Sequence, residues 1–285
     1  MTIGRNKILR AVNVIFNQVD LIGKGVLGHV IYTYKVFMLV YLAVRESIFY
    51  QVQGLRTVFR VVSAQIYFTG YQALPIVSVL AIASGAIVIL QSSAQLNFLG
   101  GAERIGDLLV AVIVREVGPL LTALIVIARS GTAVASELGN MKVNREIDAL
   151  EVMGINPLSY IVFPRVVGGI ISVVCLAFYF SFISLFGGYF ITRLLHDLPF
   201  AFYIDSLSQA FAKEDVLLFA VKNVFSGAII FAVCCYQGLS VGQSSHEVPQ
   251  ATTAAVMKSI IYVIGFNVIV TIFYYLNELI KIGVI

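Results

Sequence analysis

The sequence predicts an all-α integral membrane protein with about five transmembrane helices. Of its 285 residues, 59% are hydrophobic and only 12% are charged, and its mean hydropathy is +0.94. A soluble domain carries roughly 25% charged residues, so this chain has too few charges to cover a water-exposed surface. The same apolar content excludes intrinsic disorder. The charges that remain separate long apolar runs, which is typical of a multi-span membrane protein.

Five charge-poor runs are long enough to cross the hydrocarbon core, which takes about 20 residues of helix. We expect these spans near residues 71–96, 108–128, 166–192, 217–241 and 259–277. The second run contains the adjacent charges Arg115 and Glu116, and the fourth contains Lys222. We therefore expect one membrane domain over residues 1–285, in which residues 66–285 form the five-span bundle.

The first 65 residues have a different pattern and predict helices at the membrane surface. Residues 5–24 and 45–62 each place apolar residues on one helical face and basic or amide residues on the other. Basic amphipathic helices of this kind lie in the interface. Residues 29–44 are apolar but carry Lys35 at their centre, which favours a partly inserted elbow helix. A sixth span over these residues is the alternative.

The positions of the basic residues predict the orientation of the chain. Most of the 19 Lys and Arg residues precede the first span or lie in the loops that follow the second and fourth spans. Because basic residues are enriched on the cytoplasmic side, we expect the N-terminus in the cytoplasm and, after five spans, the C-terminus on the outer side of the membrane. A sixth span would place the basic N-terminus on the wrong side. The net charge of +4 is thus an orientation signal and does not indicate nucleic-acid binding.

A short cytoplasmic helix is predicted in the loop between the second and third spans. Asn144 is a suitable N-cap, Glu146 and Asp148 fall in the first turn, and Gly154 is placed to end the helix. The apolar stripe of this helix consists of Ile147, Leu150 and Met153. From the residues alone, the helix either rests on the bilayer or docks as a coupling helix in a groove of a cytosolic partner.

The adjacent charges Arg115 and Glu116 are the strongest candidates for a site inside the membrane. Charged residues within a span are costly and face a bundle interior or a cavity. Neighbouring residues of a helix point about 100° apart, so these two side chains do not pair with each other. Each needs its own partner, which is either an ion pair with another helix or a polar lipid headgroup.

Several kinds of chemistry are not expected in this chain. It contains no Gly-x-x-x-x-Gly-Lys-Ser/Thr motif, so active transport would need an ion gradient or a separate ATPase subunit. The scattered His and Cys residues predict no metal site, and we expect no cofactor in this chain. Residues 244–247 contain Ser, His and Glu, but adjacency in sequence is not triad geometry, so no catalytic residue is expected.

Four short motifs stand out when the charged segments are considered together. They are Arg115-Glu116-Val117-Gly118-Pro119-Leu120, Ser136-Glu137-Leu138-Gly139-Asn140-Met141, Ile147-Asp148-Ala149-Leu150 followed by Met153-Gly154, and Pro164-Arg165. In combination they resemble the MlaE/YrbE family of ABC-type permeases, which is linked to phospholipid trafficking across the Gram-negative envelope. The resemblance extends over nearly the whole chain.

The resemblance implies a non-catalytic permease subunit in the bacterial inner membrane that acts as a homodimer around a lipid cavity. Its implied partners are a second copy, a cytosolic ABC ATPase that binds ATP, a periplasmic MCE-domain lipid-binding protein and phospholipid. It places Arg115 and Glu116 at the lipid cavity. It places Glu137, Ile147, Asp148, Leu150 and Met153 at the ATPase interface.

Two other classes stay open. An ion-gradient-driven secondary transporter would need buried carboxylates near the membrane midplane, for which Glu116 and Asp107 are the candidates. A membrane scaffold without transport activity would need neither an ATPase nor a bound lipid.

Overall fold

The computed structural model describes residues 27–47, 55–99, 105–196 and 200–282, and within these ranges it contains helices and no strand. The α-helices are Leu27–Ser47, α2 (Leu55–Thr69), α3 (Leu74–Leu99), α4 (Ile105–Leu109), α5 (Gly118–Val126), α6 (Thr132–Val143), α7 (Glu146–Val152), α8 (Phe163–His196), α9 (Phe200–Ala210), α10 (Lys213–Leu239) and α11 (Glu247–Ile282). Short segments between them are the 3-10 turn η1 (Tyr71–Ala73) and the π-helical segments η3 (Val110–Val117), η4 (Ile127–Gly131) and η5 (Leu158–Val162).

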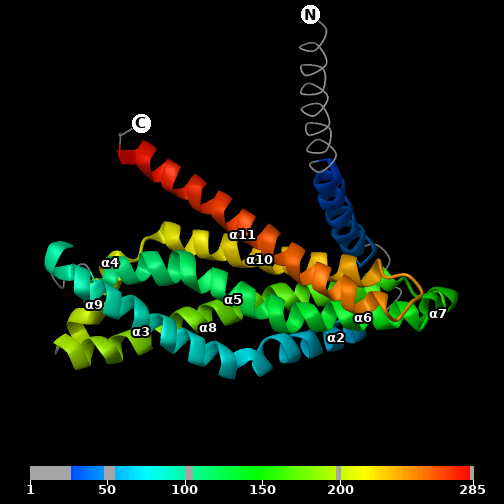
Figure 1. Cartoon of the computed structure of the whole chain (residues 1–285), viewed down its shortest axis with the longest axis horizontal. Helices are drawn as coiled ribbons and strands as arrows, with labels where there is room; N and C mark the ends of the chain where they lie inside the picture. The colour runs from blue at the N-terminus through cyan, green and yellow to red at the C-terminus, as the bar shows by residue number, and fades with distance from the viewer. Residues whose placement is uncertain (1–26, 48–54, 100–104, 197–199, 283–285) are drawn as a thin grey trace, which may run out of the picture.

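Helices α3, α5, α8 and α10 run along the longest axis of the molecule, and α11 crosses this direction obliquely (Figure 1). Helix α8 packs against α2, α3, α5 and α10, and α10 also packs against α6 and α11. The short helix α7 lies at one end of the bundle, together with the turn between α10 and α11, whereas α4 and α9 lie at the other end (Figure 1). The segments predicted on one side of the membrane thus lie at the same end of the bundle. We name the end that contains α7 the α7 end.

Six helical stretches of the described residues are long and apolar enough to cross a membrane. They are Leu27–Ser47, Val58–Gln91, Gly106–Val143, Leu158–Phe190, Lys213–Leu239 and Glu247–Lys281. The last five contain or overlap the five predicted spans, which confirms an all-α membrane protein. The first of these five includes most of α2, so the predicted boundary after residue 65 falls inside a helix that packs on α8.

The helix Leu27–Ser47 meets the length requirement for a span, with 21 residues and a mean hydropathy of 1.5. It nevertheless runs across the direction of the other long helices (Figure 1). A helix in this orientation lies along the membrane surface when the bundle crosses the bilayer, which favours the elbow interpretation. The count of five spans and the orientation that depends on it therefore stay predictions, and the interfacial helix predicted at 5–24 lies outside the described residues.

Small residues allow the central helices to approach closely. A Cβ atom on Gly85 of α3 would collide with the backbone oxygen of Ser184 in α8, and one on Gly169 of α8 would collide with the ring of Phe231 in α10. Close approach of this kind lets van der Waals packing hold helices together where lipid offers no hydrophobic driving force. The glycines thus fix α8 at the centre of the bundle.

Candidate functional site

Arg115 and Glu116 both lie in the π-helical segment η3, near the middle of the predicted second span. Segments of π-helix are frequent at functional sites because the extra residue redirects side chains. Pro119 follows η3 and has no N–H to donate to the carbonyl of Arg115 four residues earlier. That carbonyl instead accepts a hydrogen bond of 2.7 Å from Nζ of Lys222 on α10. The local backbone therefore prepares an acceptor for a cation from a neighbouring helix.

Arg115 pairs with Asp215 in the first turn of α10. Its Nε lies 2.7 Å from Oδ1 as an ion pair, and its Nη2 donates a hydrogen bond of 3.2 Å to Oδ2. Asp215 is completely buried, and it also accepts hydrogen bonds from the hydroxyl of Tyr274 at 3.1 Å and from the backbone N–H of Ala212 at 3.0 Å. The carboxylate thus joins η3, the start of α10 and α11.

Glu116 has a separate partner, which is Lys222. Nζ of Lys222 lies 2.9 Å from Oε1 of Glu116 and also donates to Oγ1 of Thr271 at 2.8 Å. The hydroxyl of Thr271 in turn donates to the Glu116 carboxylate at 3.0 Å. With the carbonyl of Arg115, all three donors of this completely buried ammonium group are satisfied.

The two pairs form one charge cluster, which we define as Arg115, Glu116, Asp215, Lys222, Thr271 and Tyr274. Asp215 and Lys222 are two turns apart on α10, and Thr271 and Tyr274 are three residues apart on α11, so each helix presents one face to η3. This geometry confirms the ion-pair alternative for both charges of η3. The assignment of Arg115 and Glu116 to a lipid cavity stays a prediction, and 38% of the Glu116 side chain is exposed.

Sequence reasoning did not identify Asp215, Lys222, Thr271 and Tyr274 as members of this cluster. One signal was available, because Lys222 interrupts an apolar run and Asp215 precedes it by two helical turns. Asp215 offers a negative charge to Arg115, and Lys222 offers a positive charge to Glu116. Thr271 and Tyr274 carry no comparable signal, since uncharged polar residues are common within spans.

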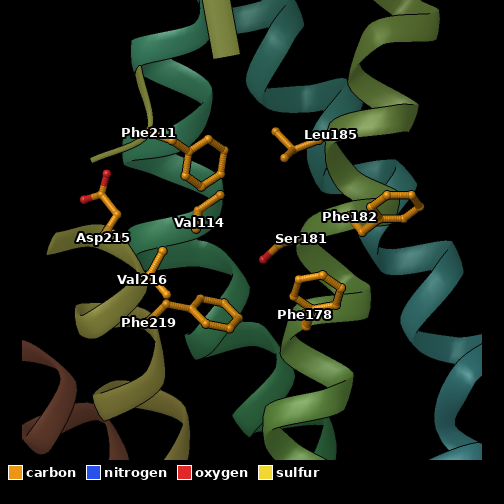
Figure 2. Close-up of a pocket in the computed structure, with 9 residues that line it drawn as sticks. All are labelled: Val114, Phe178, Ser181, Phe182, Leu185, Phe211, Asp215, Val216 and Phe219. Carbon is orange, nitrogen blue, oxygen red and sulfur yellow. The ribbon is translucent and has the colours of Figure 1, made fainter. Parts of the chain in front are cut away.

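An apolar pocket of about 310 Å³ lies beside the charge cluster, between α8 on one side and η3 and α10 on the other (Figure 2). Its wall includes the rings of Phe178, Phe182, Phe211 and Phe219. Asp215 lies at its edge with the carboxylate directed away from the pocket, and the hydroxyl of Ser181 points inward from α8 without a hydrogen-bond partner among the described residues. Such a lining suits an apolar chain with at most one polar group.

The loop helix α7 exists, but its N-terminus differs from the prediction. Arg145, with a left-handed φ of 58°, directly precedes α7, and Asn144 instead ends α6. The predicted Asn144 cap is therefore wrong, and its amide donates a hydrogen bond of 3.3 Å to the Glu146 side chain. The reason is local: Arg145 adopts the left-handed conformation and turns the chain from α6 into α7, so Asn144 serves as the C-cap of α6 and is not the N-cap of α7.

The C-terminal stop of α7 is confirmed. Gly154 has a φ of 75°, and its N–H donates to the carbonyl of Glu151 at 2.9 Å. The N–H of Ile155 donates to the carbonyl of Leu150, also at 2.9 Å. These two bonds make a Schellman motif, which glycine favours because an L side chain would strain the left-handed conformation.

The predicted apolar stripe of α7 divides into an inward and an outward part. Ile147 is buried and Leu150 packs partly buried against the main core. Met153 is 65% exposed and the adjacent Val152 is 89% exposed. Ile147 and Leu150 therefore attach α7 to its own chain, and the apolar surface that faces outward is Val152 and Met153.

The two acidic residues predicted at the ATPase interface each have a basic neighbour. Asp148 of α7 forms an ion pair of 3.1 Å with Lys142 of α6. Glu137 of α6 forms one of 2.8 Å with Arg165 at the start of α8. Both carboxylates remain more than half exposed, so they hold α6, α7 and α8 together while staying accessible.

These features define a multi-pass α-helical membrane protein with an internal charge cluster and a short helix projecting from one end. The family model described as Permease MlaE matches residues 62–273. The chain belongs to this permease family, which confirms the resemblance carried by the four motifs.

Several proteins are similar in sequence to this chain over most of its length. A probable ABC transporter permease protein of Rickettsia conorii is 35% identical over 73% of this chain and 80% of its own length. One of Synechocystis is 28% identical over 71% of this chain and 77% of its own length. The chloroplast protein TRIGALACTOSYLDIACYLGLYCEROL 1 of Arabidopsis thaliana is 25% identical over 74% of this chain and 60% of its own length.

Proposed function

We propose that this chain is the non-catalytic permease subunit of an ABC transporter that moves phospholipid between the bacterial inner membrane and a periplasmic MCE-domain partner. The proposal is supported by membership of the permease family and by relatives that are named probable ABC transporter permeases. A further relative bears the name of a diacylglycerol glycolipid. Two copies would enclose the lipid cavity, and an ATPase would dock at the α7 end.

The observation that carries the proposal is the outward surface of α7. Val152 and Met153 project from a helix whose other exposed residues are mainly charged, at the tip of the bundle (Figure 1). Apolar anchors with a charged rim are the usual way in which a helix docks in a partner's groove. Because the sequence lacks a phosphate-binding loop, that partner supplies the ATP hydrolysis.

A path for coupling leads from α7 to the charge cluster. The stretch Gly106–Val143 is helical throughout its 38 residues and contains η3, η4, α5 and α6. At a rise of 1.5 Å per residue it is roughly 55 Å long, which is more than the thickness of the hydrocarbon core. A displacement of α7 by the ATPase would act on α6 directly and reach Arg115 and Glu116 along this helix.

The charge cluster disfavours an ion-gradient-driven transporter. Such a transporter needs a carboxylate that can bind and release the coupling ion. Asp215 and Glu116 are each within 3 Å of a cationic nitrogen, so in the described structure both carboxylates are already neutralised. Asp107, the other candidate, is exposed at the start of α4 and not at the middle of a span.

Affinity purification of the complex tests the proposed function. We expect Met153→Asp to release the ATPase subunit, because a charge would replace an exposed apolar anchor. The control is Gln250→Asp, which adds the same charge at an exposed position of α11 at the same end of the bundle. Leu150→Asp is less suitable, because Leu150 packs against the core and its replacement would also disturb the fold.

The purified wild-type complex should also contain phospholipid, detected by mass spectrometry. Retention of the ATPase by Met153→Asp would refute the role of the outward surface of α7. Wild-type material that carries neither an ATPase nor phospholipid would refute the transporter assignment and support a scaffold.

A further inference from the structure

A second groove, with a volume of about 270 Å³, lies along the C-terminal half of α10. It is bounded by that helix, by the helix Leu27–Ser47 and by Tyr262 of α11. Its walls are apolar over most of their extent. The side chains that make these walls include Val36, Phe37, Val40, Ala228, Ile229 and Val233. No residue of the charge cluster lines this groove, although Lys222 lies one helical turn before Phe225 on α10.

Polar groups gather at one end of the groove. The hydroxyl of Thr33 donates to that of Tyr262 at 3.2 Å, and the amide of Gln237 donates to the hydroxyl of Tyr32 at 2.9 Å. Nζ of Lys258 lies 4.1 Å from the centroid of the Tyr32 ring. The groove thus has an apolar body and a polar end, and the cation Lys258 lies against Tyr32, one of the residues at that end.

Lys258 differs from Arg115 and Lys222 in how its charge is balanced. Arg115 and Lys222 each pair with a carboxylate, whereas no ion pair of Lys258 occurs among the described residues. Its ammonium lies over the face of Tyr32, an interaction that leaves its N–H donors available. A partly buried ammonium group without a carboxylate attracts an anionic group from outside the chain.

The length of the groove identifies what it can hold. The α10 residues that line the groove extend from Phe225 to Val233, a stretch about 12 Å long at 1.5 Å per residue. One leaflet is half of a hydrocarbon core of about 30 Å, so the groove fits within one leaflet and suits one acyl chain. A transmembrane helix of a partner would need a groove more than twice as long.

We propose that this groove binds one anionic phospholipid from the leaflet at the α7 end. The phosphate contacts Lys258 and the hydroxyl groups of Thr33 and Tyr262, and one acyl chain lies between α10 and the helix Leu27–Ser47. The lipid fastens that helix to the bundle. This site is separate from the predicted transport cavity, and its existence does not depend on the proposed transport function.

Native mass spectrometry of the full-length protein, incubated with phosphatidylglycerol or phosphatidylcholine, tests this site. We expect the wild-type protein to retain phosphatidylglycerol preferentially and Lys258→Gln to bind it at least tenfold more weakly. Lys281→Gln is the matched control, because it removes the same charge from the opposite end of α11. Its affinity for phosphatidylglycerol should equal that of the wild type.

A second variant tests the acyl-chain contact independently of charge. Ala228→Phe places a ring in the groove and should weaken the binding of phosphatidylglycerol while Lys258 is intact. Equal retention of the two lipids by the wild type, or unchanged binding by Lys258→Gln, would overturn the proposal. A disulfide between two copies that carry Phe37→Cys would also overturn it, because a second copy would then occupy the groove.

Discussion

Replacing Asp215 with asparagine should strongly destabilise the protein, because the change leaves the guanidinium group of Arg115 without a counter-charge. The Asp215 carboxylate is completely buried, and the Arg115 side chain is 16% exposed. Asparagine has nearly the same shape, so it introduces no cavity. The effect of Asp215→Asn is therefore mainly electrostatic.

The expected magnitude follows from the geometry of this pair. Removing one partner of a buried ion pair costs about 3–5 kcal/mol, because the other charge stays desolvated. The slight exposure of Arg115 lets water reach part of the guanidinium group, and the asparagine oxygen can still accept one hydrogen bond. We therefore expect a loss near the lower limit, about 3 kcal/mol in the free energy of unfolding.

Two further variants separate the missing counter-charge from general damage. The double variant Arg115→Met with Asp215→Asn has no unpaired charge, so it should be more stable than Asp215→Asn alone. Glu214→Gln is the matched control at the preceding position, since its ion pair with Lys281 is about half exposed and is worth less than about 1 kcal/mol.

The assay is unfolding in mixed micelles with increasing denaturing detergent, followed by far-UV circular dichroism. Tryptophan fluorescence is not an option, because the sequence contains no Trp. The reasoning is refuted when Asp215→Asn lies within about 0.5 kcal/mol of Glu214→Gln, the usual range for surface substitutions. It is also refuted when the double variant is less stable than Asp215→Asn.

Two predictions concern glycines. Gly85→Leu should separate α3 from α8, since even a Cβ would collide with the Ser184 backbone oxygen. Size-exclusion chromatography should then show less monodisperse protein. The control is Gly265→Leu, whose Cβ meets open space and which should leave the elution profile unchanged. Gly154→Val should strain the left-handed end of α7 by roughly 1–2 kcal/mol, since φ is 75° and no neighbour is within 4 Å. Limited proteolysis should then cut faster near α7 while the bundle stays intact, and an unchanged cleavage rate would contradict the strain.

Features that depend on local sequence were predicted well. The apolar runs located the spans because about 20 consecutive apolar residues are sufficient to specify a membrane helix. Gly154 was recognised as the end of α7 because the left-handed conformation there requires no distant contact. The first residue of α7 was missed, since the left-handed turn at Arg145 has no glycine to signal it.

Features that depend on tertiary packing could be predicted only in part. The sequence indicated that Arg115 and Glu116 each need a partner, but Asp215 and Lys222 lie about 100 residues further along the chain. Their proximity follows from the packing of α10 on η3, which no local pattern encodes. Similarly, Ile147 and Met153 belong to one stripe in sequence, yet only Met153 faces outward, because α7 packs against its own chain.

The positions of the π-helical segments relate these packing features to the proposed coupling. Arg129 lies in η4, where it donates hydrogen bonds of 2.7 Å to the carbonyl of Phe68 and 2.8 Å to the side chain of Gln72. Arg115 and Glu116 lie in η3 and bind α10 and α11. Each π segment of the helix Gly106–Val143 thus carries charges that hold a neighbouring helix. Because a π segment accommodates an extra residue within a hydrogen-bonded helix, it is where the helix can change register with the least loss of hydrogen bonds. A shift imposed at α7 would therefore be expressed at η4 and η3, so that α2, α10 and α11 move while the backbone between them stays helical.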